Sequence, residues 1–217
     1  CALPIYHHNN FYSARDFRAR STTRYLELLK ASLLNEHYLE LEQRVRFLFL
    51  RQLGRRDAVS ADPVISWEEL VNARRTGTRP GSDRTGTKMP YTAMGRARLD
   101  HLHACLDHAR TEGVHGDFVE VSAGRAGGAI FMRGFLEAHE LMGRRVYVAD
   151  RFRVNESSED RIEFWADLNA ARNGFDRFDL LDDRVRFLQG PAAETLPDAP
   201  IERRSEEHTS ELQSHHD

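Results

Sequence analysis

The sequence predicts a mixed α/β fold in which an N-terminal helical segment precedes an incomplete, parallel, doubly wound sheet. Two observations predict it. Residues 117–134 (DFVEVSAGRAGGAIFMRG) read as a short buried strand, a turn of small residues and an apolar helix. A second strand, a helical pattern and a third strand follow, so that helices are succeeded by the order β-α-β-α-β that is typical of a parallel sheet.

Composition excludes several classes of protein. The 217 residues carry a net charge of −3, which does not favour binding to nucleic acid or to an anionic membrane. No apolar stretch is long enough to cross a bilayer and no signal peptide is visible, so we expect a cytoplasmic protein. The two cysteines, Cys1 and Cys105, form neither a disulfide framework nor a metal site, and Cys105 is expected as a small core residue.

Residues 24–54 predict one or two helices that end at Gly54. The expected apolar face comprises Tyr25, Leu28, Leu29, Ser32 or Leu33, Leu41, Val45 and Leu48. Ser66 can cap a short helix that ends at Gly77. Residues 76–90 are rich in Gly, Thr and basic side chains and read as a loop, either a lid or a solvated linker.

The remaining elements alternate between helix and strand. A helix is expected after residue 91, with Leu99, Leu102, Leu106 and Ala109 on one face and Gly113 as its stop. The sheet follows with strands at 118–121, 144–150 and 182–190, and with an apolar helix at 130–141. Between the last two strands, Ser157 and Asp160 form a possible capping box for a helix that carries Ile162, Trp165 and Leu168.

The turn after the first strand is compatible with more than one ligand. Ser122-x-Gly124-x-x-Gly127 approximates a dinucleotide fingerprint, with Ser in place of the first Gly. Glu120-x-Ser122-x-Gly124-x-Ala126 approximates the loop of methyltransferases that use S-adenosylmethionine. A third interpretation is a close-packed turn without a ligand. Glu120 needs a polar partner if it is buried, and Asp150 at the end of the second strand suits ribose hydroxyls with either cofactor.

The wider pattern resembles the macrocin O-methyltransferase family, whose members methylate sugar hydroxyls on natural products. The resemblance runs through RYLELLK (24–30), YTAMGRARLDHL (91–102), GDFVEVSAGRAGGAIFMRG (116–134), VYVAD (146–150), LLDDRVRFLQG (180–190) and TLPDAPI (195–201). It implies a Rossmann-like class I methyltransferase sheet and S-adenosylmethionine as the cofactor. The cofactor-lining positions that it implies are Thr92, Glu120, Ser122, Gly124, Gly127 and Asp150.

The turn also departs from the family pattern. Ser122 stands where the family has its first Gly, Gly124 where it has Trp, and Ala126 where it has another Gly. Ser122 is tolerable at its position if its φ is negative, whereas a strained turn would cost about 1–3 kcal/mol.

The resemblance also implies Mg²⁺, which would lower the pKa of the acceptor hydroxyl, held by acidic residues that lie beyond the end of the matched region. Asp182 and Asp183 read as a turn pair and not as metal ligands. No catalytic or metal-binding residue is therefore assigned in this chain.

The sequence divides into a helical segment with its loop (1–90), a partial cofactor-binding domain (91–203) and a polar tail (204–217). The tail resembles a translated sequencing-library adapter, and we expect a fragment that is catalytically inactive and prone to aggregate through an open sheet edge. The expected activity of the intact enzyme is methyl transfer to a hydroxyl of a glycosylated small molecule, with a homo-oligomer possible. The alternatives are a nicotinamide-dependent oxidoreductase and a non-catalytic cofactor-binding fragment.

Overall fold

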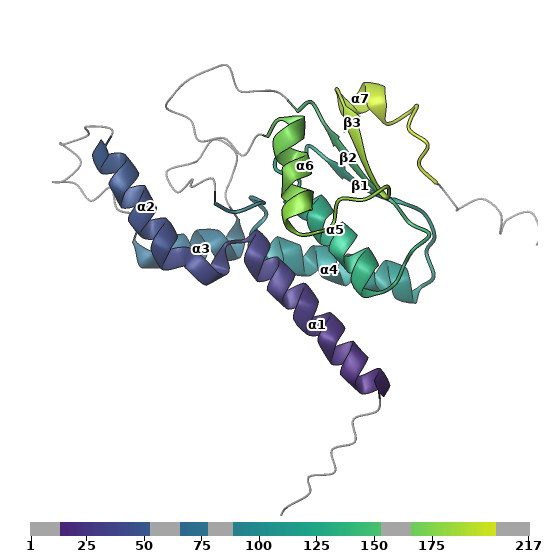
Figure 1. The fold of residues 1–217 in the computed structure, drawn as a ribbon, viewed down its shortest axis with the longest axis horizontal. Helices are drawn as coiled ribbons and strands as arrows, with labels where there is room; N and C mark the ends of the chain where they lie inside the picture. The colour runs from purple at the N-terminus through teal and green to yellow at the C-terminus, as the bar shows by residue number, and fades with distance from the viewer. Residues whose placement is uncertain (1–13, 53–65, 78–88, 153–165, 203–217) are drawn as a thin grey trace, which may run out of the picture.

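The computed structural model describes residues 14–52, 66–77, 89–152 and 166–202. Three helices open the chain: α1 (Ala14–Leu33), α2 (Leu39–Gln52) after the short 3₁₀ turn η1 (Glu36–Tyr38), and α3 (Trp67–Thr76). The rest alternates as α4 (Gly95–Thr111), β1 (Phe118–Val121), α5 (Gly127–Ala138), β2 (Val146–Asp150), α6 (Leu168–Arg177), β3 (Val185–Gln189) and α7 (Ala192–Thr195). Figure 1 shows α2 and α3 at one end of the molecule and the sheet at the other.

The strands form one parallel sheet in the order β1-β2-β3, which confirms the predicted architecture. Val121 lies opposite Ala149 in β2, and Ala149 lies opposite Leu188 in β3. All five residues of β2 are buried. β1 is only partly buried, contrary to expectation, because within the described residues it pairs with β2 alone, and Val121 is 49% exposed.

Helix α5 is the centre of the core. It is buried from Gly127 to Leu136 and packs between the sheet and α1. Gly134 permits the close approach of α1, because a Cβ there would lie 2.3 Å from Leu29 Cδ2. On the opposite face of the sheet, Tyr147 of β2 is 1% exposed and its hydroxyl donates a hydrogen bond to the Pro200 carbonyl at 2.7 Å.

Several local signals are confirmed. Ser66 and Glu69 form a reciprocal capping box at the start of α3, and Gly77, with φ 87°, ends that helix. The capping box expected at Ser157 and Asp160 and the stop at Gly54 lie outside the described residues. Helix α6 begins at Leu168, with the Asp167 carboxylate accepting from Ala170 N, so Leu168 opens this helix instead of lying within it.

The predicted apolar face of the N-terminal helices was partly wrong. The buried leucines of α1 are Leu26, Leu29 and Leu33, whereas Tyr25, Leu28, Leu41, Val45 and Leu48 are exposed. A leucine-rich helix offers two faces with helical spacing, and the tertiary partner α5 selects one of them. Cys105 was also placed wrongly in the core: it is exposed, with its sulfur 3.6 Å from His101 Nε2.

A buried ion pair joins the two helices farthest from the sheet. Glu42 of α2 is 1% exposed and accepts hydrogen bonds from Arg74 of α3 at 2.5 Å and from Asn35 at 2.7 Å. Removing one member of such a pair leaves the other charge buried, which is strongly destabilising.

We therefore expect Arg74→Ala to lower the free energy of unfolding by about 3 kcal/mol. Arg75→Ala, which removes an exposed neighbour bonded only to Asn72 among the contacts described, is the matched control and should change stability by less than about 0.5 kcal/mol. Urea denaturation followed by circular dichroism measures both. Equal effects of the two substitutions would contradict a structural role for the buried pair.

Candidate functional site

The carboxyl ends of β1 and β2 bring the predicted site residues together. The Ser122 amide donates to the Ala149 carbonyl at 2.9 Å, so the turn that leaves β1 begins beside the end of β2. Asp150 is the last residue of β2. In open parallel sheets this edge is where ligands bind, because the turns after neighbouring strands form a crevice there.

The turn itself is wound in an unusual conformation. Ser122, Gly124 and Ala126 have φ values of 58°, 54° and 60°, all in the left-handed region. The negative φ that would make Ser122 free of strain is therefore not found. Two residues with a Cβ therefore occupy positions that favour glycine, at a cost of roughly 1–2 kcal/mol each. The Ser122 side chain is exposed, whereas Ala126 is fully buried and precedes the first residue of α5.

Glu120 caps helix α5 from the neighbouring strand. Ala126 stands at the N-cap position and has no side-chain acceptor to offer. The Glu120 carboxylate is the acceptor in its place, since Ala129 N donates to its Oε2 at 2.7 Å, and the Gly128 amide also bonds to it. The polar partner that a buried acid requires is thus supplied by the helix, whose amides and dipole favour a negative charge.

The enclosure of this carboxyl group changes its acidity. Burial raises the pKa of Glu120 to about 7, the two backbone hydrogen bonds oppose that change, and the nearby Asp150 charge adds to it. The residue as a whole is partly exposed, but its carboxyl group is enclosed: a Cβ on Gly128 would lie 2.3 Å from Oε1. Gly128 is therefore required for the carboxylate to reach the helix.

Asp150 ties the turn to the second strand. It is 7% exposed, and its Oδ2 accepts a hydrogen bond from Gly124 N at 2.9 Å while its Oδ1 accepts one from Phe152 N at 3.2 Å. These bonds fix the carboxylate at the strand edge. Each oxygen retains a further lone pair for another donor.

Thr92 approaches the same turn from the segment before α4. It is 8% exposed and its hydroxyl accepts from Met94 N at 3.1 Å. A Cβ on Gly127 would lie 2.7 Å from Thr92 Cβ, so the segment lies directly on the start of α5. The six predicted residues are therefore gathered at one edge of the sheet, and their contact with a cofactor stays a prediction.

Sequence reasoning did not single out Arg125, the one charged residue between Ser122 and Gly128. Its Nη1 donates to the Pro90 carbonyl at 2.7 Å, across 35 positions of sequence. A charged side chain in a turn of small residues was the available signal.

Asp182, one of the two acidic residues that precede β3, has structural partners. Asp182 accepts hydrogen bonds from Arg133 at 2.6 Å and from Arg184 at 3.0 Å, and its pKa is lowered to about 2: the hydrogen bonds from these arginines outweigh the opposing effect of burial. No group of three or more His, Cys, Asp or Glu residues suited to a metal occurs in the described ranges. The described residues therefore do not offer the expected Mg²⁺ a site. Nor does any helix among them have the length and apolar character needed to cross a bilayer.

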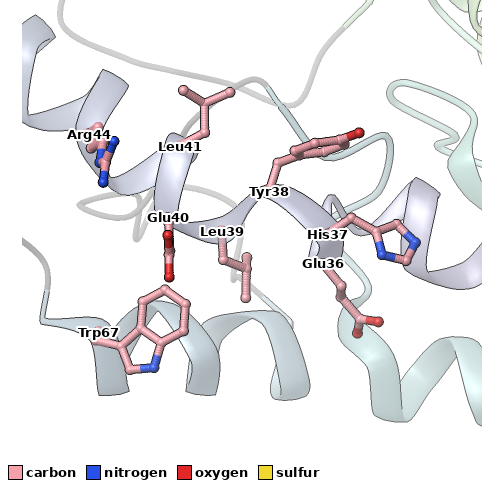
Figure 2. A pocket seen from close by; sticks show the side chains of 8 residues that line it. All are labelled: Glu36, His37, Tyr38, Leu39, Glu40, Leu41, Arg44 and Trp67. Carbon is pink, nitrogen blue, oxygen red and sulfur yellow. The ribbon is translucent and has the colours of Figure 1, made fainter.

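A separate pocket of about 340 Å³ is lined by η1, the first turns of α2 and the first residue of α3. Figure 2 shows its lining, which consists of Glu36, His37, Tyr38, Leu39, Glu40, Leu41, Arg44 and Trp67. None of the predicted cofactor residues contributes to it, and its helices lie away from the sheet (Figure 1).

Comparison with known proteins gives consistent matches. Residues 22–205 match the family model described as Macrocin-O-methyltransferase (TylF). The solved structure of the O-methyltransferase NovP is similar with a TM-score of 0.59 and 28% sequence identity, over 83% of this chain and 69% of that one.

Two curated relatives extend the match. The 8-demethyl-8-(2,3-dimethoxy-alpha-L-rhamnosyl)-tetracenomycin-C 4'-O-methyltransferase of Streptomyces olivaceus is 36% identical over 76% of this chain. The mycinamicin III 3''-O-methyltransferase of Micromonospora griseorubida is 32% identical over 77% of it. The chain spans 65% of the length of the first and 69% of the second.

The strained turn gives the first prediction for the site. Ser122→Gly should raise the free energy of unfolding by about 1 kcal/mol, because relief of the left-handed strain exceeds the extra entropy lost by glycine. Ser122→Ala keeps the strain and should leave stability within about 0.5 kcal/mol. Urea denaturation distinguishes them. A Ser122→Gly variant less stable than Ser122→Ala would show that φ is not positive there.

The raised pKa of Glu120 gives the second prediction for the site. The folded state holds the proton of the Glu120 carboxyl group more tightly than the unfolded state does. The contribution of this proton to stability is therefore complete below pH 4.5 and is lost as the pH rises through about 7. The free energy of unfolding of Glu120→Gln, taken relative to that of the natural chain, should therefore rise by about 2–3 kcal/mol between pH 4.5 and 8. Parallel pH profiles of unfolding free energy would contradict this.

Glu137→Gln is the control for that series. Its hydrogen bond from Arg133 lowers the pKa of Glu137, so the natural carboxylate contributes stability above its ordinary pKa and loses it on acidification. The relative stability of this variant should therefore change with pH in the opposite direction.

Proposed function

The chain belongs to the macrocin O-methyltransferase family, and on that premise we propose that it binds S-adenosylmethionine and serves methyl transfer to a hydroxyl group of a glycosylated small molecule. The single observation that carries the choice of cofactor is the position of the Glu120 carboxylate on the amides that open α5.

That position argues against a dinucleotide. A pyrophosphate binds at the helix N-terminus because free amides and the helix dipole attract its negative charge. Here an acidic side chain occupies the Ala129 amide, and in its ionised form, which predominates above about pH 7, it would repel a pyrophosphate. The same arrangement is compatible with a sulfonium cofactor, whose charged groups include positive ones. The nicotinamide alternative is therefore disfavoured by the local geometry.

The role that we propose for each cofactor-binding residue follows from its position in the site. Asp150, an acid at the edge of β2 with lone pairs to spare, would accept hydrogen bonds from ribose hydroxyls. The exposed Ser122 and the backbone at Gly124 and Gly127 would form the wall at the end of β1. Thr92 would close the site from the segment before α4.

The chemistry that the cofactor supplies when bound is a methyl group activated by a positively charged sulfur. Transfer of this methyl group to an acceptor hydroxyl would form a C–O bond and break the C–S bond, whose electrons would go to sulfur, while a base would take the hydroxyl proton. The contribution of the described residues is to position the donor for in-line attack. No described residue is assigned as the base, and no step is assigned to a metal.

The acceptor class rests on the relatives. Their names specify the 4'-hydroxyl of a rhamnosyl-tetracenomycin and the 3''-hydroxyl of mycinamicin III, which are sugar positions on secondary metabolites. A sugar hydroxyl on a compound of antibiotic type is accordingly the proposed acceptor, and a cytoplasmic location suits a small-molecule enzyme of this kind.

Isothermal titration with S-adenosylhomocysteine and with NADH tests the cofactor assignment. We expect binding of the former only. Asp150→Ala should weaken that binding by about 1–3 kcal/mol, because a hydrogen bond to a charged group is lost. Binding of NADH alone would overturn the assignment.

Asp117→Ala is the matched control. Asp117 also accepts two backbone hydrogen bonds, from Arg145 at 2.8 Å and from Glu202 at 2.9 Å, but it lies at the other end of β1. The two variants thus lose the same number of backbone bonds. Only Asp150→Ala should change the affinity, and equal effects would assign Asp150 a structural role alone.

A further inference from the structure

We infer that Arg125 is a positioning residue, which holds the Pro90–Thr92 segment on the glycine-rich turn and so sets the affinity of the cofactor site; the second half of this inference rests on the proposed function. Neither the family match nor the sequence patterns assigned a role to this residue.

The side chain of Arg125 makes two contacts with the same segment. Nη1 donates to the Pro90 carbonyl at 2.7 Å, and the guanidinium carbon lies 5.0 Å from the centre of the Tyr91 ring, over its face. A planar, delocalised cation can donate in its plane and stack on an aromatic face at the same time. Lysine can do only one of these with its single ammonium group.

Tyr91 in turn joins parts of the chain that are distant in sequence. Its amide donates to the Leu33 carbonyl at the end of α1 at 2.7 Å. Its hydroxyl accepts from Arg177 of α6 at 3.2 Å, and its ring meets that of Phe178 edge-on at 5.1 Å. Arg125 therefore contacts a residue, Tyr91, that is also bound by α1 and α6.

The segment and the turn are in direct contact. A Cβ on Gly127 would lie 2.5 Å from the Tyr91 carbonyl oxygen, and one on Gly128 would lie 2.4 Å from Met94 Cε. With so little space, a small displacement of the segment moves Thr92 relative to the start of α5. Burial lowers the pKa of the Arg125 guanidinium, which agrees with a side chain withdrawn from water to make this contact.

The anchoring is tested without any ligand. In the 217-residue chain, Arg125→Ala should speed the hydrogen–deuterium exchange of the backbone amides in residues 89–94, which include the Pro90–Thr92 segment, by about tenfold or more. This is expected when an interaction that opposes local opening is lost. Arg125→Lys should give most of the same increase. Unchanged exchange in Arg125→Ala would overturn the inference outright.

The effect on the site is tested by titration with S-adenosylhomocysteine. Arg125→Ala should raise the dissociation constant about tenfold. Arg184→Ala, which loses hydrogen bonds to Asp182 and Glu137 away from the turn, should lower the thermal midpoint without changing that constant. Tyr91→Leu should weaken binding as Arg125→Ala does, and the double variant should be no weaker than either single one.

The outcomes separate the two proposals. If the natural chain does not bind S-adenosylhomocysteine but Arg125→Ala still frees the segment, the proposed function fails and the anchoring stands. If the natural chain binds and Arg125→Ala binds within twofold, the link between Arg125 and the cofactor site is overturned.

Discussion

The contact between Glu120 and the start of α5 is the constraint on which the rest of the site depends. A parallel strand and the helix that follows it must be joined by a turn, and the helix then presents unpaired amides. In this chain the strand supplies the acceptor, since the Glu120 carboxylate reaches back to Ala129 N. The Ala129 amide is thereby occupied by a side chain of the protein, and the helix dipole opposes in part the effect of burial, which raises the pKa of this carboxyl group to about 7. The proposed choice of cofactor rests on this one bond.

The same contact explains the composition of the turn. The carboxylate can reach the helix only if residue 128 has no Cβ, and the segment before α4 can lie on the helix only if residue 127 has none. Positions 122 and 126 are different: their backbone favours glycine, yet they carry Ser and Ala. At Ala126 the methyl group is buried in the core, which offsets part of the strain. At Ser122 the side chain is exposed and gains no such burial, so its strain is retained at the edge where a ligand would lie.

Local sequence signals predicted the elements better than they predicted which side chains are buried. The capping box of Ser66 and Glu69 and the stop at Gly77 depend on neighbours in sequence, and the strands are marked by short local apolar runs; these elements were predicted correctly. The faces of α1 and the place of Cys105 depend on which partner packs against a helix, and no periodicity in one segment specifies that. The six site residues were predicted from the resemblance to a family, and the rule for parallel sheets explains only why those that follow β1 and β2 lie at one edge. The contacts of Arg125 with Pro90 and of Glu120 with Ala129 could be identified only from the structure, because no local sequence pattern connects the residues that make them.

The two ends of the sheet use the same residue types for different purposes. At the amino end, Asp117 accepts backbone amides from two segments, and Asp182 is enclosed by Arg133 and Arg184, so that both carboxylates have protein partners that lower their energy. At the carboxyl end, Asp150 is also bonded to amides, but it stands beside an exposed serine in a strained turn and beside a glutamate whose pKa is raised. Strain and raised pKa values lower stability, and they persist where the surrounding structure enforces them. The amino end therefore serves to hold the strands together, and the carboxyl end retains the less favourable arrangements, which lie among the residues that we propose to bind the cofactor.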